Sequence, residues 1–199
     1  MTRLILIRHG ETRWNLQKKY QGHANPGLSA TGKKHVRALA ARIKDLGIDG
    51  LYTSPLKRAR QTAAILSAKT GFKPHPDARI KELNFGNWEG KTAAELIAQN
   101  DKNFRSWLEG QWKTPKGGES LAELNRRVRA FLKDCVKKHK GKKIAIVSHG
   151  GPLRMMILLA LGLGAQAFFS FGLEPATFLI LNLDDFSRSQ IGRLRALQG

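Results

Sequence analysis

The chain has 199 residues, 41% of them hydrophobic, which is enough for one globular domain with a sizeable core. Lys and Arg total 35 against 15 Asp and Glu, so the net charge of +20 should attract anions such as phosphorylated metabolites or nucleic acid. The single cysteine, Cys135, excludes an intramolecular disulfide and, with no secretory signal pattern and no apolar stretch of membrane-spanning length, predicts a cytoplasmic protein.

The basic residues are scattered along the chain, and this scatter predicts solvated faces rather than a nucleic-acid groove. The main groups are Lys18-Lys19, Lys33-Lys34, Arg126-Arg127, the run from Lys137 to Lys143, and Arg188, Arg193 and Arg195. They form no single stripe interleaved with aromatic side chains, and no RNA-binding motif is present. No nucleic-acid partner is therefore expected.

The first predicted element is a buried strand that ends in a basic residue, a histidine and a glycine. Residues 4–7 are all aliphatic, and Arg8, His9 and Gly10 follow at once. A short continuous apolar run is typical of a strand in a parallel sheet. Ligands of open α/β sheets bind outside the carboxyl ends of the strands, where Arg8 and His9 would lie.

A loop, a helix and a short strand are predicted next. Residues 11–32 lack periodicity and contain several turn-forming residues, which predicts a loop beside His9. Ser29 is a candidate N-cap for a helix whose apolar positions repeat over 36–46 and which ends at Gly47. Residues 48–52 then predict a short strand.

The second helix is expected to begin at Ser54. This residue would be the N-cap, with Pro55 at the first helical position and Gly71 at the end of the helix. Arg58 would then lie in the first turn, just past the end of a strand. A helix N-terminus with an arginine beside it is a ready anion site.

The middle of the chain has weaker signals. Two prolines break residues 72–77, and residues 78–89 mix acidic and aromatic side chains as a loop would. Thr92 begins a capping box, and helical signals alternate with breaks over 92–118. Three aromatic residues in this stretch are expected to be exposed: Phe104, Trp107 and Trp112.

The most regular helix is predicted from a second capping box at Ser120 to Gly141, with Cys135 on its apolar face as a core thiol. A second buried strand over 144–147 follows, and it too ends in a histidine and a glycine. The two strands together indicate that a histidine followed by a glycine occurs twice at the same edge of a sheet.

The last part of the chain adds an apolar helix over 153–161 and a strand over 177–183. A polar, basic tail starts at Asp184 and has room for one edge strand. Strands alternate with helices along the chain, which predicts an α/β fold with a mainly parallel sheet. The whole chain, 1–199, is expected to be one domain.

The two strand-end histidines are the strongest functional signal. His149 and Gly150 repeat the pattern of His9 and Gly10, so neighbouring strands would bring both histidines to one crevice. A lone histidine in such a place is more often structural than catalytic. Two histidines in the same context favour a catalytic site.

These histidines, with Arg8 and Arg58, have the chemistry of a phosphoryl-transfer site. Guanidinium groups offer planar pairs of donors that match phosphate oxygens. An imidazole can attack phosphorus and form a covalent intermediate, and cationic donors around it stabilise the charge of the transferring group. The second histidine would add a further donor.

The leaving alcohol needs a proton, and Glu82 is the candidate that supplies it. Its segment also holds Phe85 and Trp88, and apolar surroundings of this kind keep a carboxyl group protonated. Glu11 and Glu89 compete for this role on position alone.

No metal or other cofactor is expected. The six histidines show no metal-binding spacing, and Asp184-Asp185 stands alone in a turn. There is no Walker loop and no Gly-x-Gly-x-x-Gly motif at the start of a helix.

Taken together, these segments resemble the histidine phosphatase superfamily, the phosphoglycerate-mutase-like proteins. The resemblance covers nearly the whole chain, and its motifs are specific in combination. The matching segments are Arg8-His9-Gly10-Glu11-Thr12 with Asn15, Tyr20-Gln21-Gly22, Leu28-Ser29-Ala30-Thr31-Gly32, residues 54–63, residues 82–90, Gly117-Gly118-Glu119-Ser120 and Val147-Ser148-His149-Gly150-Gly151.

The resemblance implies a three-layer α/β/α sandwich and a role for each matching residue. His9 would be the phosphorylated nucleophile and Glu82 the proton donor. Residues 92–118 would cover the pocket, and their aromatic side chains would decide the substrate. The phosphoryl group would be held by Arg8, Arg58 and His149, with Asn15 and the main chain of Gly150 as further contacts and Gln21 on the substrate side.

Within this superfamily, phosphatases and cofactor-dependent mutases compete as the activity. The acid segment, Phe85-Gly86-Asn87-Trp88-Glu89-Gly90, resembles the phosphatase branch, which includes the α-ribazole phosphatases. Asn25-Pro26-Gly27-Leu28 departs from the common Asp-x-Pro-Leu and leaves the substrate open. We therefore predict a metal-independent phosphomonoesterase that acts on a small phosphorylated metabolite as a monomer or homodimer. A phosphoglycerate mutase is the first alternative, and an anion- or RNA-binding protein on an inactive scaffold is the second.

Overall fold

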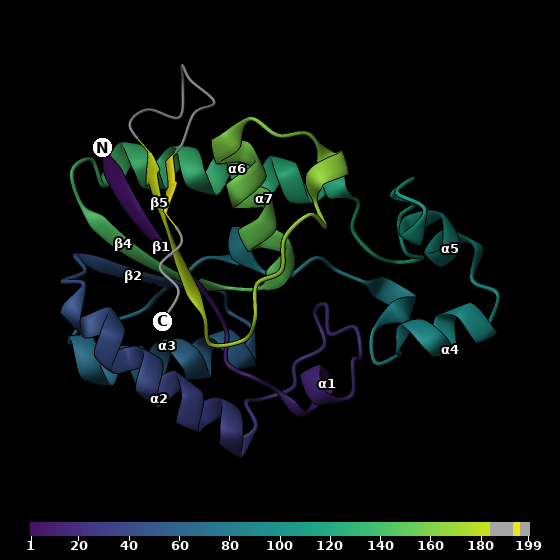
Figure 1. The fold of residues 1–199 in the computed structure, drawn as a ribbon, viewed down its shortest axis with the longest axis horizontal. Helices are drawn as coiled ribbons and strands as arrows, with labels where there is room; N and C mark the ends of the chain where they lie inside the picture. The colour runs from purple at the N-terminus through teal and green to yellow at the C-terminus, as the bar shows by residue number, and fades with distance from the viewer. Residues whose placement is uncertain (184–192, 196–199) are drawn as a thin grey trace.

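The computed structural model describes residues 1–183 and 193–195, whose backbone forms one six-stranded sheet in the order β3-β2-β4-β1-β5-β6 (Figure 1). Strands β1 to β4 are parallel where they pair, and β5 runs antiparallel to β1 and β6. The strands are β1 Thr2–Arg8, β2 Gly50–Thr53, β3 His75–Pro76, β4 Lys143–Ser148, β5 Phe178–Leu183 and β6 Arg193–Arg195.

Helices cover both faces of the sheet, so the predicted three-layer α/β/α sandwich with a mainly parallel sheet is confirmed. Figure 1 shows α2 and α3 on one face and α6 and α7 on the other, with α1, α4 and α5 grouped beyond one end of the sheet. The helices are α1 Arg13–Leu16, α2 Ala30–Asp45, α3 Lys57–Thr70, α4 Ala93–Ala98, α5 Lys102–Leu108, α6 Leu121–Lys138 and α7 Gly150–Leu161, and the short 3₁₀ turns are η1 Ala78–Ile80, η2 Gly86–Trp88 and η3 Ala165–Ala167.

The continuous apolar run in β1 follows from this layering. Leu4 and Leu6 belong to the core under α6 and α7, whereas Ile5 and Ile7 belong to the core under α2 and α3. A strand that is buried on both faces needs apolar side chains at every position. Residues 4–7 are all fully buried, as their uninterrupted aliphatic sequence predicts.

Several predicted helix ends are confirmed. Ser29 caps α2 and accepts a hydrogen bond from the Gly32 amide, and Gly71 ends α3 in the left-handed conformation with φ of 79°. Thr92 and Ser120 form the predicted capping boxes. Cys135 is buried, and burial raises the pKa of its thiol to about 12, as befits an inert core residue.

Other local predictions are wrong. The predicted loop over 11–32 contains the short helix α1, capped by Thr12, and α7 begins at Gly150 rather than at residue 153. Ser54 does not cap α3, whose N-cap is Leu56. The Ser54 hydroxyl instead contacts His149, which makes it part of the site described below.

The aromatic residues of 92–118 are less exposed than predicted. Phe104 and Trp107 are fully buried and belong to the main core, and Trp112 packs edge-on against Trp107 with ring centroids 5.4 Å apart. The helices α4 and α5 are too short to show a clear apolar period, so their inward face was not visible in the sequence. Of the predicted basic tail, the edge strand β6 is confirmed, and residues 184–192 and 196–199 lie outside the described residues.

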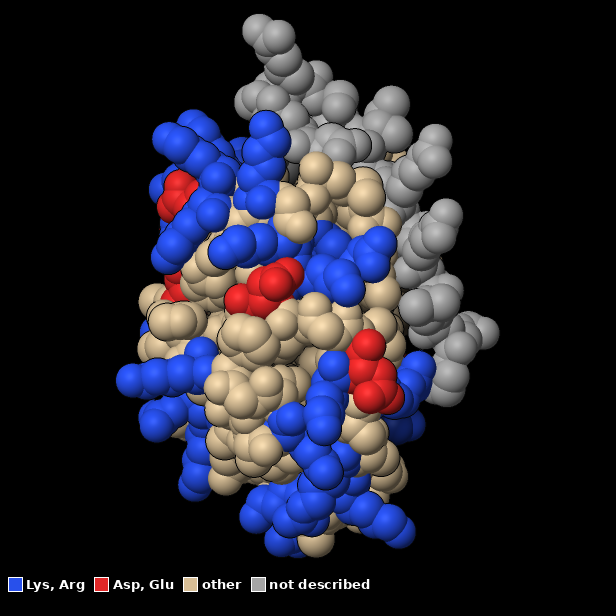
Figure 2. All heavy atoms as spheres, turned by 90° about the vertical axis from the view of Figure 1, so that its left-hand side faces the viewer, with Lys and Arg blue, Asp and Glu red and all other residues tan. Residues whose placement is uncertain are grey.

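Two surface observations complete the fold. In the described part of the chain, no helix is both long enough and apolar enough to cross a membrane. Figure 2 shows the side of the molecule away from α4 and α5, where lysine and arginine side chains are spread in several groups with neutral surface between them.

Candidate active site

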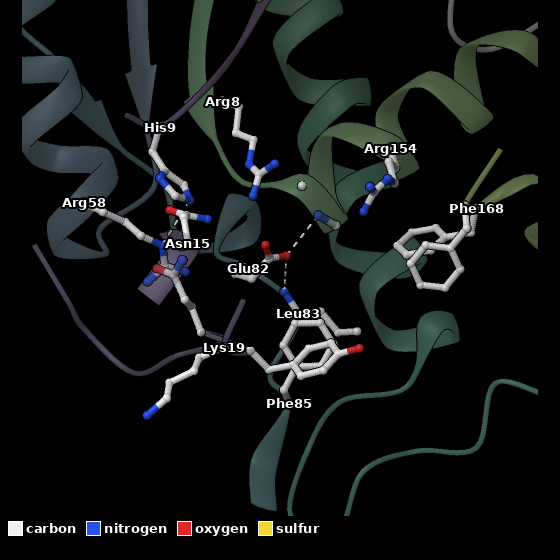
Figure 3. A pocket seen from close by; sticks show the side chains of 15 residues that line it. Arg8, His9, Asn15, Lys19, Arg58, Glu82, Leu83, Phe85, Arg154 and Phe168 are labelled. Atoms are coloured by element: carbon white, nitrogen blue, oxygen red, sulfur yellow. Dashed lines mark hydrogen bonds between the residues drawn. The ribbon is translucent and has the colours of Figure 1, made fainter. Parts of the chain in front are cut away.

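A pocket of about 170 Å³ lies beyond the carboxyl ends of β1 and β4 (Figure 3). These strands are parallel neighbours, with Ile7 opposite Val147 and Arg8 opposite Ser148, so the residues that follow them meet at one edge. The pocket is lined by Arg8, His9, Asn15, Lys19, Tyr20, Gln21, Arg58, Glu82, Leu83, Phe85, Gly150, Gly151, Arg154, Phe168 and Phe169. We call Arg8, His9, Arg58 and Gly150, together with His149 packed behind the lining against His9, the inner end, and Lys19, Tyr20, Phe85, Arg154, Phe168 and Phe169 the outer end.

His9 forms the floor of the pocket and is 2% exposed. Its Nδ1 lies 2.7 Å from the carbonyl oxygen of Gly10, and its Nε2 lies 3.2 Å from Nε of Arg58. An Nδ1–H that donates to Gly10 leaves the lone pair on Nε2. Burial, with the positive charges of Arg58 and Arg8, holds the pKa of His9 well below 6.5. The ring is therefore neutral at pH 7, as a nitrogen nucleophile must be.

The two arginines of the inner end are held differently. Arg58 is fully buried in the first turn of α3, where its Nη atoms donate to the carbonyls of Ala24 and Gly22 at 2.9 Å each. Burial lowers the pKa of Arg58 to about 10, so it remains charged at neutral pH. Arg8 donates through Nη1 to the carbonyl of Leu173, and its buried Nε has no partner among the described residues. Both guanidinium groups keep donors for an anion, since each has five N–H bonds.

His149 stands beside His9, with ring centroids 5.0 Å apart, which confirms that the two strands bring both histidines together. Its Nε2 lies 2.7 Å from Oγ of Ser54, and Oγ also accepts a hydrogen bond of 3.3 Å from the Leu56 amide. The hydroxyl hydrogen of Ser54 is thus free to donate to Nε2, which places the ring proton on Nδ1. That Nδ1 is buried and has no partner among the described residues.

Three further predicted contacts, Asn15, Gln21 and Gly150, line the pocket. Asn15 uses its Oδ1 to accept from the Thr12 amide and hydroxyl at the start of α1, which leaves its amide nitrogen as a donor. Gly150 is the first residue of α7, where amide groups and the helix dipole favour an anion. Gln21 is buried, and its Oε1 has no hydrogen-bond partner in the described part of the chain.

The geometry separates Glu82 from its two competitors. Only Glu82 lines the pocket among the three, with Oε1 accepting hydrogen bonds from the amides of Leu83 at 2.8 Å and Gly151 at 3.0 Å (Figure 3). Glu11 accepts from the Ser29 hydroxyl, and Glu89 accepts from the amides of His23 and Ala24 in a neighbouring loop. Both competitors are therefore occupied in structural hydrogen bonds.

The surroundings of Glu82 are more polar than predicted. Phe85 lines the same pocket, but Trp88 is buried in the core and donates its indole N–H to Asp101 at 3.1 Å. Three guanidinium groups face the pocket together with Glu82 instead. The apolar niche that the sequence suggested is thus only one wall of the site.

Arg127 was missed by the sequence reasoning, although it holds the segment that carries Glu82. From α6 it donates to the carbonyls of Arg79, Lys81 and Glu82 at 2.7, 2.7 and 2.9 Å. Its guanidinium also forms a bidentate pair with Glu119 at 2.6 and 2.8 Å. Five hydrogen bonds from one side chain therefore fix the backbone on either side of the acid.

The outer end of the pocket is formed by loops and aromatic rings. None of the residues 92–118 lines it, so the prediction that this stretch covers the pocket and decides the substrate stays a prediction. Trp112 instead packs behind Phe168 and Phe169, at centroid distances of 6.3 and 5.3 Å. Arg154, also missed, enters the pocket from α7; a single charged residue inside an apolar helix was the signal for it.

The donor set does not resemble a metal site. In the described residues no group of three or more His, Cys, Asp or Glu could hold a metal ion. The one pocket-lining carboxylate faces several cationic side chains, whereas Mg²⁺ and Ca²⁺ need a set of oxygen ligands. The inner end is suited to an anion.

Comparison with known proteins agrees with this geometry. The family model described as histidine phosphatase superfamily (branch 1) matches residues 4–192. The chain belongs to the histidine phosphatase superfamily. Phosphoserine phosphatase 1 of Hydrogenobacter thermophilus is 36% identical over 186 residues, which cover 93% of this chain and 88% of that protein.

Relatives of this histidine phosphatase differ in their named activities. A probable phosphoglycerate mutase of Yersinia enterocolitica is 36% identical over 84% of this chain and 78% of its own length. The crystal structure of α-ribazole phosphatase from Shigella flexneri has a TM-score of 0.86 and 28% identity, covering 99% of this chain and 96% of the other. The protein is a phosphomonoesterase of the histidine phosphatase type.

Proposed function

We propose that the enzyme hydrolyses a small phosphomonoester through a phosphohistidine at His9, without a metal ion. The observation that carries this proposal is the buried, neutral ring of His9 at the pocket floor, with Arg8 and Arg58 lining the same pocket and the ring of His149 packed against it. Nδ1 of His149 and Nε of Arg8 are buried and have no hydrogen-bond partner among the described residues. Buried polar atoms are normally satisfied, so two such nitrogens at this end of the pocket favour binding of an anion. The volume of about 170 Å³ favours a small substrate.

The first step transfers the phosphoryl group to the enzyme. Nε2 of His9 attacks phosphorus and forms the P–N bond while the bond from phosphorus to the ester oxygen breaks. Glu82, in its protonated form, gives its proton from Oε2 to the departing oxygen, since Oε1 accepts two main-chain N–H groups. Arg8, Arg58, His149 and the Gly150 amide hold the equatorial oxygens.

The second step returns the enzyme to its starting state. A water molecule attacks phosphorus from the side that the alcohol left, and the carboxylate of Glu82 takes its proton. The P–N bond breaks, and its electron pair returns to Nε2 of His9. Inorganic phosphate leaves, and its fourth oxygen comes from the water molecule. Asn15 and Gln21 are proposed to position the phosphoryl group and the substrate.

Two alternatives predict different products. A phosphoglycerate mutase would return the phosphoryl group to a bound intermediate, and the Yersinia relative carries that name. An anion- or RNA-binding protein on an inactive scaffold would need the inner end to be degraded, whereas its histidines and arginines are all in place. On the face that Figure 2 shows, the basic side chains form separate groups and no continuous basic groove.

The remaining proposals concern the whole chain. We propose one domain over 1–199 in which residues 92–118 support the pocket from behind, because Trp112 packs on Phe168 and Phe169. A cytoplasmic location and a monomeric or homodimeric state also stay proposals.

The deciding experiment measures phosphate release from a panel of phosphomonoesters in the presence of EDTA, with wild type and His9→Ala. We expect release by wild type alone, with the variant at least about 10⁴-fold slower because the nucleophile is missing. Wild type quenched in alkaline detergent should carry a base-stable, acid-labile phosphoryl group on His9. Isomerisation of phosphoglycerate without phosphate release would support the mutase, and loss of activity in EDTA would overturn the metal-free mechanism.

Glu82 is tested by the leaving group. Glu82→Gln should lower kcat for an alkyl phosphate by about 10²- to 10³-fold, because an alkoxide needs a proton as it departs. For p-nitrophenyl phosphate, whose leaving group needs no proton, the loss in the first step should be far smaller. Equal losses on both esters would contradict the role of Glu82 as the acid.

A further inference from the structure

Arg154 is a cation in the pocket that the phosphohistidine mechanism leaves without a task. It lies on α7, where its Nε donates to the carbonyl of Phe171 at 3.0 Å. Its guanidinium carbon lies 5.4 Å from the centroid of the Phe169 ring. These two contacts fix the plane of the guanidinium, and no described residue accepts a hydrogen bond from Nη1 or Nη2. The two terminal nitrogens, Nη1 and Nη2, are therefore a pair of donors that is fixed in position and free to bind a ligand; we call this pair the fork.

The fork lies next to the atoms that meet the leaving group. A β-carbon placed on Gly150 would be 3.5 Å from Nη1 of Arg154 and 3.9 Å from Oε2 of Glu82. Figure 3 shows Arg154 on the opposite side of Glu82 from His9 and Arg58, with its terminal nitrogens directed into the pocket. A group bound by the fork would therefore lie close to Glu82, on the side of this acid that faces away from His9 and Arg58.

The charges in the pocket indicate the sign of that group. Burial lowers the pKa of Arg154, and Glu82 and Glu174 raise it, but neither carboxylate forms an ion pair with it. A partly buried guanidinium without an anionic partner costs free energy that a bound anion would recover. The phosphoryl group is already faced by Arg8 and Arg58, so the anion for Arg154 must come from the rest of the substrate.

We propose that Arg154 binds a carboxylate of the substrate, which makes the substrate a small phosphomonoester with a carboxylate close to its ester oxygen. This inference rests on the proposed function and adds a specificity-determining residue to it. A planar carboxylate matches the two terminal nitrogens of a guanidinium. Lys19 lines the same pocket, but Figure 3 shows its ammonium group directed away from Arg154 and Glu82.

The test compares esters that differ in the carboxylate. One pair is phosphoserine and phosphoethanolamine, and the other is 3-phosphoglycerate and glycerol 3-phosphate. Wild type should prefer the carboxylate member of each pair in kcat/KM. Arg154→Met should lower that preference by about 10- to 100-fold, the effect of losing one charge-assisted pair of hydrogen bonds, and Arg154→Lys should lower it less.

Two control variants separate this role from a general loss of positive charge. Arg60, exposed on α3, is outside the pocket, and Arg60→Met should keep the wild-type preference. Lys19→Met should reduce the preference less than Arg154→Met does. The inhibition constant of inorganic phosphate should stay within about threefold in Arg154→Met if the fork does not bind the phosphoryl group.

Each contrary result has a distinct meaning. Turnover of all four esters without a carboxylate preference would overturn the role of Arg154 and leave the proposed function standing. An equal loss on both members of each pair, with weaker phosphate inhibition, would assign Arg154 to the phosphoryl group instead. A preference that disappears in Lys19→Met and persists in Arg154→Met would overturn the assignment to Arg154. If wild type hydrolysed none of the esters, the proposed function itself would be overturned.

Discussion

The inner and outer ends of the pocket are built from different parts of the fold. Inner-end residues stand at the ends of β1 and β4 and in the first turns of α3 and α7, and His9, Arg58 and His149 are at most 2% exposed. The outer end consists mainly of loop residues, and Phe169 is 51% exposed. Groups mounted on a buried sheet keep their geometry, whereas loop residues can be exchanged with little effect on the core. The chemistry therefore belongs to the inner end and substrate choice to the outer end.

This comparison predicts two kinds of variant. A change at the inner end should slow turnover of every phosphomonoester, because it alters the groups that face the phosphoryl group. A change at the outer end should alter the order in which esters are preferred. The acid Glu82 lies between the two ends. A change in the residues that hold its segment should therefore lower kcat by an amount that depends on the leaving group of the ester.

Among the residues that support the site without lining the pocket, Arg127 should show the largest effect. Arg127→Met removes five hydrogen bonds around the segment of Glu82 and leaves Glu119 without its partner, so it should lower the free energy of unfolding by about 2–4 kcal/mol. In Arg127→Lys, which keeps the charge, kcat for an alkyl phosphate should fall by about 100-fold and that for p-nitrophenyl phosphate much less.

Its neighbour supplies the matched control. Arg126 is exposed on α6, and Arg126→Met should leave both rates near wild type. In a Glu82→Gln background, Arg127→Lys should add no further dependence on the leaving group. A loss that is equal on both esters would show that Arg127 only stabilises the fold.

Acidification should have the next largest effect, and it originates at the inner end. Burial, with the nearby arginines, lowers the pKa of both His9 and His149 in the folded protein. Below pH 6.5 the unfolded chain binds protons that the folded protein does not, so the free energy of unfolding falls as the pH falls. Between pH 7.5 and 5.5 each histidine should contribute a loss of up to about 1.4 kcal/mol.

Denaturant unfolding at the two pH values measures this loss. His149→Asn should reduce the pH dependence by up to about 1.4 kcal/mol, whereas the outer-end variant Phe169→Leu should keep it unchanged. His139, whose pKa burial also lowers, contributes equally in all three proteins. An unchanged pH dependence in His149→Asn would mean that the pKa of this histidine is the same in the folded and unfolded states, and would contradict its lowering by burial.

How much of this site is visible in the sequence depends on the distance between partners along the chain. His9 and His149 could be predicted because each directly follows an aliphatic run, and Glu82 because its own segment resembles a known motif. The prediction that Trp107 is exposed was wrong, because a helix as short as α5 shows no reliable repeat of apolar residues in the sequence. Arg154 left a weak trace, as a charge in an apolar helix.

The supporting residues left no such trace. Ser54 has the local pattern of a helix cap, and nothing near it in the sequence reveals that its partner is His149, 95 residues away. Arg127 contacts carbonyl groups 45 to 48 residues before it, and a carbonyl carries no side-chain signature at all. Contacts of this kind depend on how the layers pack, so they require the structure.

Ser54 should show the smallest of these effects, and it tests whether the inner end depends on a defined histidine tautomer. Ser54→Ala removes the hydroxyl that lies 2.7 Å from Nε2 of His149, so the ring proton is no longer directed to Nδ1. We expect kcat to fall by about tenfold on every ester, in keeping with about 1.4 kcal/mol for one buried hydrogen bond. Phe169→Leu, at the outer end, should instead change the preference between esters. In a His149→Asn background Ser54→Ala should cost nothing more, and a full further loss there would show that the serine acts on α3 rather than through the histidine.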